Sequence, residues 1–443
     1  MKEKEEFPLL KIYSDRSELI SGSNERQVFK EGKSSVEARA RHEKIRNVLS
    51  KGYLESLIEE CKKPQIKIEN LSEEHLKLIE SLVNSVTSEV GRAVVGLMVL
   101  QLTIKSILPE QSIRLHKASL GADFSWVEGV PMRTLDKYYF TPTLRKHDLL
   151  RLNADGIMMT RSLAENYPYS KLYKAAIRGA KSEWTELIDL VESGQLDSLN
   201  ALKQMIVFLY NKSEAFTTLV DETLNKLNDY VWSNPDFDTC YHFVVKFIAQ
   251  SAYSARMFEV AIHALMQVLD ELKLLSGFLK PLSQMRSANK KHGNIGDIEL
   301  TQTKDKMDIL ESWDAKYGKS YLRDELEELN EKLYSHPQAL LVGFITDDHP
   351  NLKAEIKERI LELETINDIE IKILNLKDWV DFQCEKYSVN KFKIGSRWLV
   401  AIAETICQKR REIAPIDEPT TEWVRTFNSL LPVSGPAPKK TLF

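Results

Sequence analysis

The uninterrupted apolar run at 339–345 is the feature that most constrains how this chain of 443 residues can fold. An apolar run without alternation is typical of a strand that is covered on both faces of a sheet. Leucines at helical spacing precede it at 320–334, and a helical stretch followed by a strand-like run at 369–374 comes after it. The sequence therefore predicts a mixed α and β fold, with helices packed on a sheet in the C-terminal half.

Two short apolar runs, 298–300 and 309–313, flank a polar loop before the first of those helices. This arrangement is typical of two neighbouring antiparallel strands. Because side chains repeat every two residues along a strand, we expect Asp314 and Lys316 to point to the same side and Asp297 to face Asp314. Two carboxylates and an ammonium group at one edge of a sheet suit a hard divalent cation and a phosphate.

This set of residues resembles the motif of the PD-(D/E)XK nuclease superfamily, and within it the type II restriction endonucleases. Asp297 takes the place of the first acid, Asp314 that of the second, and Lys316 that of the lysine. Gly296 stands where the motif has proline, and the second acid is Asp rather than the commoner Glu. The resemblance covers residues 255–380, and a short motif of this kind is a hypothesis that its structural context must support.

The resemblance implies a fold, a cofactor and roles for these residues. The fold is a restriction-endonuclease-like α/β sheet core that follows a large, mainly helical N-terminal region. Asp297 and Asp314, with the backbone carbonyl of Ala315, would hold Mg²⁺, and Lys316 would position or help to deprotonate the attacking water. A metal ion in such a site stabilises charge on the transition state and lowers the pKa of a bound water.

Further residues are candidates for the same site. Glu311, three residues before Asp314, is a candidate catalytic auxiliary acid, and so is Glu259 on the helix predicted at 255–278. Basic residues before the first acid can hold the DNA backbone near the scissile phosphate, and these are Arg286, Lys290, Lys291 and His292.

The acid-x-Lys pattern is weak on its own, and Glu370-Ile-Lys372 is its serious rival because it lies in a strand-like run downstream of Asp347 and Asp348. A helical stretch from residue 351 separates those acids from Glu370, whereas the nuclease hairpin has only a turn there. Asp348, with Pro350 two residues later, is better explained as a helix cap. Glu370 and Lys372 then lie on the outer face of an edge strand, and the upstream set is favoured.

A second block with functional character lies at 111–181, where 12 Lys and Arg stand against 6 Asp and Glu in a chain of net charge −4. Aromatic and hydrogen-bonding side chains accompany the cations, and such a set can contact phosphates and base edges. The alternative is a solvated basic face. The candidate DNA-binding residues here are Arg114, Lys117, Arg133, Lys137, Arg145, Lys146, Arg151, Asn153, Arg161, Lys171, Lys174 and Arg178.

The chain divides at a turn-rich break that follows residue 232. The expected parts are a charged N-terminal arm or small helical cap at 1–70, a helical DNA-recognition domain at 71–234, the nuclease domain at 235–412, and an irregular tail at 413–443.

Composition excludes several other classes. The four cysteines lie far apart without a C-x-x-C pair, so neither zinc nor a disulfide framework is implied. The amino terminus lacks the apolar core of a signal peptide, and the apolar run 93–100 is too short to span a bilayer, so we expect a cytoplasmic protein. Walker, Rossmann and serine-hydrolase motifs are missing.

These observations predict a Mg²⁺-dependent, sequence-specific double-stranded DNA endonuclease of the type II restriction class. Cutting both strands with one site per chain favours a homodimer, paired in function with a cognate DNA methyltransferase. Three alternatives stay open: a catalytically silent DNA-binding protein, a repair or modification-dependent nuclease, and an α/β interaction protein without a nucleic-acid role.

Overall fold

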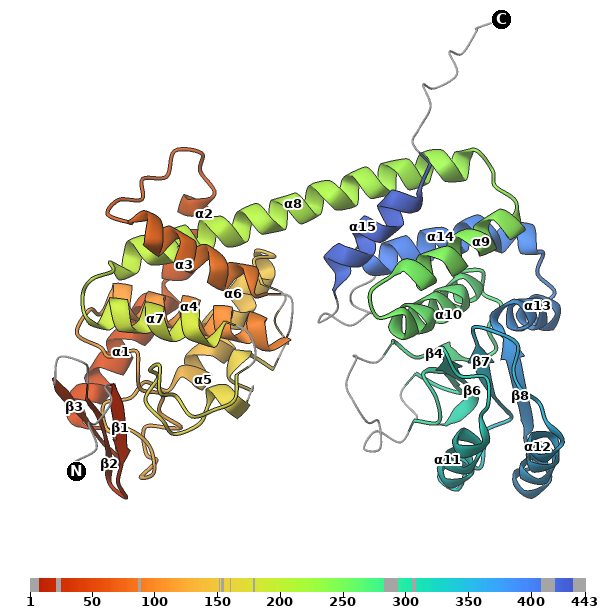
Figure 1. Cartoon of the computed structure of the whole chain (residues 1–443), viewed down its shortest axis with the longest axis horizontal. Helices are drawn as coiled ribbons and strands as arrows, with labels where there is room; N and C mark the ends of the chain where they lie inside the picture. Colours follow the sequence, from red (N-terminus) through yellow and green to blue (C-terminus); the bar gives the residue numbers. More distant parts are fainter. Residues whose placement is uncertain are drawn as a thin grey trace, which may run out of the picture. The chain divides into compact units, whose positions relative to one another are not determined.

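The computed structural model describes residues 8–20, 25–86, 89–150, 152, 155–159, 161–177, 180–282, 294–304, 308–407 and 419–432. Its contacts divide the chain into two compact units, Met1–Ala215 and Phe216–Phe443. The division falls inside the continuous helix α8 (Ser198–Trp232), whereas the sequence placed it at the turn after that helix (Figure 1). Within the described ranges, no helix combines the length and apolar character that a membrane span requires.

The N-terminal unit is built around α4 (Glu89–Ile107), whose side chains from Val94 to Ile104 are buried almost all round, as the sequence predicted for a central helix. Residues of α1 and α2, which the sequence assigned to a separate arm or cap, belong to the same core. The other helices of the unit are α1 (Val36–Ser50), α2 (Tyr53–Cys61), α3 (Glu73–Asn84), α5 (Met132–Leu135), the π-turn η1 (Asp136–Phe140), α6 (Thr141–Lys146), the 3₁₀ turns η2 (Ile157–Met159) and η3 (Arg161–Leu163), and α7 (Lys181–Glu192).

The start of the chain corrects the expectation of a charged arm or helical cap. It forms a three-stranded antiparallel sheet of β1 (Leu9–Ile12), β2 (Arg16–Ile20) and β3 (Arg26–Lys30), in that order. Ser17 and Leu19 of β2 are buried on one face, while Arg16 and Glu18 occupy alternate positions with Ile20. A strand needs only one buried face, so the charged side chains on the other face concealed the period of two in the sequence.

The C-terminal unit contains a five-stranded mixed sheet in the order β4-β5-β6-β7-β8. Its strands are β4 (Phe278–Leu279), β5 (Ile298–Thr301), β6 (Ile309–Lys316), β7 (Leu341–Thr346) and β8 (Glu370–Asn375). The first three pair antiparallel, and β6, β7 and β8 pair parallel. All six residues of β7 are buried, which confirms the predicted strand covered on both faces.

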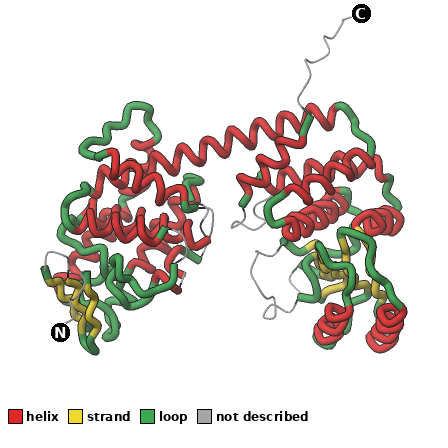
Figure 2. The backbone as a smooth tube through the Cα atoms, in the orientation of Figure 1, coloured by secondary structure: helices red, strands yellow, loops and turns green. Residues whose placement is uncertain are grey.

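Helices cover both faces of this sheet (Figure 2). On one face, Trp313, Leu341 and Ile345 pack with α10 (Ser254–Glu271), α13 (Leu376–Lys386) and α14 (Lys391–Ile406). On the other, Val342 and Phe344 pack with α11 (Arg323–Leu333) and α12 (Ala354–Asn367). The alternation along each strand thus feeds two separate cores, as the mixed α and β prediction required.

The segment 413–443 was predicted to be irregular, but it contains the helix α15 (Thr420–Leu430). Trp423, Val424 and Phe427 are buried at helical spacing, and the helix packs against α14 and α9 (Phe237–Gln250). The prolines that suggested an irregular tail only border the helix, since Pro419 directly precedes it.

Candidate functional site

Asp297 and Asp314 lie opposite each other at the end of the β5–β6 hairpin. The register pairs Ile298 with Trp313, so Asp297, directly before β5, stands across from Asp314. The backbone N–H of Asp297 donates to the carbonyl of Trp313 at 3.0 Å, and its Oδ2 accepts from the N–H of Ala315 at 3.0 Å. The side chain of Asp297 thereby continues the hydrogen bonds of the hairpin beyond the last paired residues. The N–H of Ala315 holds its carboxylate in place.

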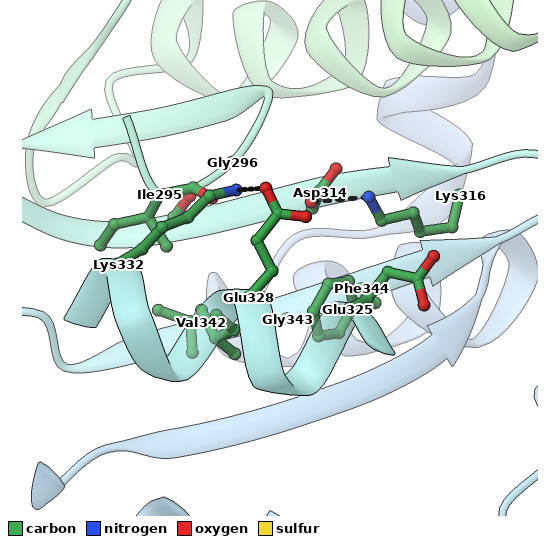
Figure 3. A pocket seen from close by; sticks show the side chains of 12 residues that line it. Ile295, Gly296, Asp314, Lys316, Glu325, Glu328, Lys332, Val342, Gly343 and Phe344 are labelled. Atoms are coloured by element: carbon green, nitrogen blue, oxygen red, sulfur yellow. Dashed lines mark hydrogen bonds and ion pairs between the residues drawn. The ribbon is translucent and has the colours of Figure 1, made fainter. Parts of the chain in front are cut away.

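Asp314 and Lys316 stand on the same face of β6, as their spacing predicted (Figure 3). The Nζ atom of Lys316 lies 3.0 Å from Oδ2 of Asp314, and the two side chains are 19% and 16% exposed. They border a small cavity of about 10 Å³ between β6 and α11, and Glu328 and Lys332 of α11 also line it. A cavity of that size has room for about one water molecule.

Two residues that sequence reasoning did not assign a role hold the loop before Asp297. A Cβ on Gly296 would lie 2.8 Å from the carbonyl oxygen of Trp313, so the close approach of this loop to β6 requires glycine. The buried Glu299 accepts from the N–H groups of Ile295 at 2.7 Å and Gly296 at 3.3 Å. Its other oxygen pairs with Lys280 at 2.7 Å. A charged residue inside the apolar strand 298–300 was the available signal for Glu299.

Carboxyl groups gather at this end of the hairpin. Burial raises the pKa of Asp297 well above its usual range, and the neighbouring Asp314 and Glu259 raise it further, against the N–H of Ala315. Burial also raises the pKa of Glu259 on α10, although Arg256 pairs with it. Glu259 therefore lies beside the two aspartates, as the sequence suggested for an auxiliary acid.

Lys316 is the cation that opposes these carboxylates. Burial lowers its pKa, but Asp314, Asp297 and Glu325 outweigh burial, and the net shift is upward. The ammonium form is therefore the stable one in this setting. Arg256 pairs with Glu259 and Lys319 pairs with Glu325, so Lys316 is left facing the two aspartates. Two carboxyl groups against one ammonium group favour a proton or a cation in the cluster.

The donor atoms at the site fit Mg²⁺. Asp297 and Asp314 supply carboxylate oxygens, and the carbonyl of Ala315 points to the same side of β6 as its N–H, toward Asp297. In the described part of the chain, no group of three or more His, Cys, Asp or Glu side chains is arranged to hold a metal ion. Two carboxylates and a carbonyl nevertheless suffice for Mg²⁺, which keeps several of its waters.

Glu311 lies away from this site, contrary to the expectation that it assists catalysis. It is buried on the opposite face of β6, where it accepts from Trp313 Nε1 at 2.7 Å and pairs with Lys386 of α13. Its separation of three residues from Asp314 is odd, and an odd spacing on a strand means opposite faces.

Arg114 and Lys117 are buried parts of the N-terminal unit and present no surface for DNA. Arg114 pairs with Asp189 at 2.6 Å and donates to the carbonyl of Tyr169 at 2.9 Å. Lys117 is 0% exposed and donates to the carbonyls of Gly32, Ala122 and Ser125. A count of charges cannot separate such buried cations from exposed ones.

Other candidates from the basic block are exposed: Arg133, Lys137, Arg145, Lys146, Arg161, Lys171 and Lys174. Two of them pair with acids, Lys146 with Glu55 and Lys171 with Glu186 at 3.9 Å. The remaining candidates Arg151, Asn153, Arg178, Arg286, Lys290, Lys291 and His292 lie outside the described residues.

The rival acid-x-Lys pair lies on the edge strand β8, where Lys372 and Glu370 form an ion pair at 2.6 Å. The helix predicted from residue 351 begins at Ala354 with Lys353 as its N-cap. Asp348 instead accepts from the N–H of His349 and does not cap that helix.

Comparison with known proteins supplies no family for this chain, since no protein-family model and no curated protein matches it. Function is therefore inferred from Asp297, Asp314, Lys316 and the residues that position them.

Proposed function

We propose that the chain is a Mg²⁺-dependent endonuclease of the PD-(D/E)XK superfamily that cuts double-stranded DNA at specific sites, as type II restriction enzymes do. One observation carries the proposal. The carboxylate of Asp297, fixed by the N–H of Ala315, faces Asp314, and Lys316 Nζ lies 3.0 Å from Asp314 on the same strand face. Two acids and a lysine at the end of one hairpin are the residue types that metal-assisted phosphodiester hydrolysis uses.

The sheet supports the same proposal. An antiparallel hairpin, β5–β6, leads into the parallel strands β7 and β8, with α10 and α11 on opposite faces. We assign this arrangement to the restriction-endonuclease-like core that the resemblance implies. The strand that carries Asp314 lies in the middle of the five-stranded sheet, where its neighbours hold it rigidly.

Each residue has a role in the proposed reaction. Asp297, Asp314 and the carbonyl of Ala315 would hold the metal, and Glu259 would add negative charge beside them. When bound, Mg²⁺ would stabilise charge on the phosphate and lower the pKa of a bound water. Lys316 would position the attacking water and offset the negative charge of the scissile phosphate.

The partners follow from this proposal. Exposed cations of the basic block, such as Lys137 and Arg145, would contact the DNA backbone. We further propose that the chain acts as a homodimer, with one site for each strand, and alongside a methyltransferase that protects the same sequence.

Purified protein incubated with unmethylated phage DNA, in Mg²⁺ and in EDTA, tests the proposal. Asp314→Asn is the test variant, and Glu370→Gln is the matched control, because both change the acid of an acid-x-Lys pair on a strand of the same sheet. We expect discrete bands in Mg²⁺ only and full activity in Glu370→Gln. Asp314→Asn should lose about 10²–10³-fold, the cost of removing one charge-stabilising group from an active site.

Other outcomes point elsewhere. The reverse pattern in the two variants would move the site to β8. DNA binding without cleavage would favour a silent DNA-binding protein, and cleavage limited to damaged or methylated DNA would favour a repair or modification-dependent nuclease. If the protein neither binds nor cleaves DNA, a role in nucleic-acid chemistry is rejected.

A further inference from the structure

The N-terminal sheet turns one face toward its own unit. Phe29 of β3 packs edge-to-face on the buried Trp126, with ring centroids 6.2 Å apart. Ser17 pairs with Phe29 in the sheet register, and both Ser17 and Leu19 on that face are buried. Because side chains alternate between the faces of a strand, the residues between them lie on the opposite, outward face.

The outward face is cationic. Arg16 of β2 pairs in register with Lys30 of β3, and Lys11 of β1 pairs with Glu18 of β2. Arg26 lies on the same face at the start of β3. Glu18 is the acid of this face, and Asp15, just before β2, also pairs with Arg16 at 2.9 Å. The apolar Leu9, Ile20 and Val28 fill the remaining positions of the face.

The carboxylate of Glu18 lies under two guanidinium groups. Its Oε1 accepts from Arg16 Nε at 3.0 Å and from Arg26, and its side chain is only 2% exposed. The side chains of Arg16 and Arg26 are 35% and 56% exposed. Glu18 therefore orients both arginines. Arg16 also donates from Nη1 to Asp15 at 2.9 Å, so it keeps fewer N–H groups for a ligand than the more exposed Arg26, although a guanidinium has five donors.

We propose that the outward face of β1–β3 is a second DNA-binding surface, on which Arg16, Arg26 and Lys30 contact the phosphates of a duplex as the strands lie along its major groove. A sheet of three strands spaced about 4.8 Å apart is about 10 Å wide, and the major groove, about 12 Å wide, admits β-ribbons. Arginine forks match phosphate oxygens in geometry and charge. This inference rests on the proposed DNA substrate, and it adds a surface outside the block at 111–181.

Binding of a fluorescein-labelled duplex of about three helical turns, measured by anisotropy in EDTA, tests this surface. The test variant combines Arg26→Gln and Lys30→Gln. The matched control combines Lys63→Gln and Lys67→Gln, which removes the same charge from exposed lysines between α2 and α3 of the same unit.

Each lost phosphate contact lowers the slope of log K against log salt by about 0.9. We therefore expect the sheet variant to lose about two units of slope and to bind at least tenfold more weakly, while the control binds like the unaltered protein. Equal losses in both variants, or none in the sheet variant, would overturn the inference.

Two further variants separate a DNA contact from a structural role. Lys30→Gln alone leaves both arginines on Glu18, and we expect it to lose about one unit of slope with an unchanged melting temperature. Glu18→Gln removes the negative charge from the face but keeps an oxygen that accepts from both arginines, so DNA binding should strengthen. If these arginines served only to stabilise the sheet, Glu18→Gln would lower the melting temperature and leave DNA binding by the folded protein unchanged.

Cleavage in Mg²⁺ is read separately from binding in EDTA. An unaltered protein that binds through the sheet but does not cut supports this surface and overturns the nuclease. If the unaltered protein cuts DNA and the sheet variant binds it normally, the nuclease is supported and the sheet surface is overturned. Binding by the unaltered protein to an acidic protein but not to duplex DNA would also overturn the inference.

Discussion

The ammonium group of Lys316 lies 3.0 Å from Oδ2 of Asp314, two residues apart on one strand. Burial by itself lowers the pKa of this lysine, so the net rise in its pKa measures how strongly the nearby carboxylates stabilise the cation. In the proposed reaction, Asp314 would hold the metal and Lys316 would face the phosphate, so this ion pair links the two roles.

Lys316→Gln should lower the cleavage rate by about 10²–10³-fold, the range expected when a group that stabilises charge in the transition state is lost. Its effect on duplex binding in EDTA should be small. Lys372→Gln is the matched control, because Lys372 also pairs with an acid two residues before it. Equal activity of the two variants in a cleavage time course would contradict the assignment of Lys316.

Gly296→Ala should destabilise the C-terminal unit by about 1–3 kcal/mol, as overpacking does, because the added Cβ would meet the backbone of Trp313 and the hydroxyl of Ser312 at 2.8 Å. Cleavage should fall as well, since Asp297 shares this loop. Gly121→Ala, whose Cβ meets nothing within 4 Å, is the control. Urea unfolding followed by tryptophan fluorescence measures both, and identical midpoints would contradict the predicted clash.

Glu311→Gln should weaken the fold and spare the chemistry. The substitution leaves Lys386 and Trp313 without their charged partner, at a cost of about 1–3 kcal/mol. Cleavage per folded molecule should stay within about threefold of the unaltered protein, a change worth under 1 kcal/mol. Loss of cleavage at unchanged thermal stability would return Glu311 to the active site.

Lys117→Met should lower the unfolding free energy, because buried carbonyls that lose their donor cost about 1–3 kcal/mol each. DNA affinity of the folded protein should not change, since Lys117 is 0% exposed. Lys137→Met should leave the unfolding free energy unchanged and weaken DNA binding, because Lys137 is exposed. Denaturation and anisotropy on both proteins test this, and weaker DNA binding by folded Lys117→Met would contradict it.

Stability of the N-terminal unit should fall as the solution is acidified from pH 7 to 5. Burial, followed by the charge of Arg133, lowers the pKa of His116 from 6.5 to about 4. The folded protein favours the neutral imidazole, so protonation is easier in the unfolded chain. Stability is therefore highest above the pKa of the unfolded state and is lost as the pH falls toward the pKa of the folded state. The loss due to His116 by pH 5 is about 2 kcal/mol. His116→Gln should flatten this dependence, and an unchanged pH slope in urea titrations would contradict the assignment.

The sequence shows which side chains of a strand share a face, because they alternate. This rule explains which parts of the site could be predicted. Asp314 and Lys316 share a face because they are two apart, and the short polar loop between two apolar runs placed Asp297 opposite them. The same rule excludes Glu311, three residues from Asp314, although a list of nearby acids includes it. The position of Glu299 as a support depends on backbone N–H groups, which a sequence does not display.

Burial of charged residues is less legible. Arg114 and Lys117 contribute to the same basic block as Lys137, yet their partners come from distant parts of the chain, such as Asp189 and Gly32. The N-terminal sheet was missed because its strands are short and charged on one face, and only pairing reveals that Ser17 and Leu19 are covered.

Gly296 has a consequence for how such sites are found from sequence patterns. The motif spells proline at this position, but here the backbone of β6 lies too close to the preceding loop for any side chain. If the proposed function is correct, a pattern search keyed to proline would pass over this chain. The informative criterion is backbone clearance, and a search that accepts glycine before the first acid, with a buried acid two residues after it, would recover chains built like this one.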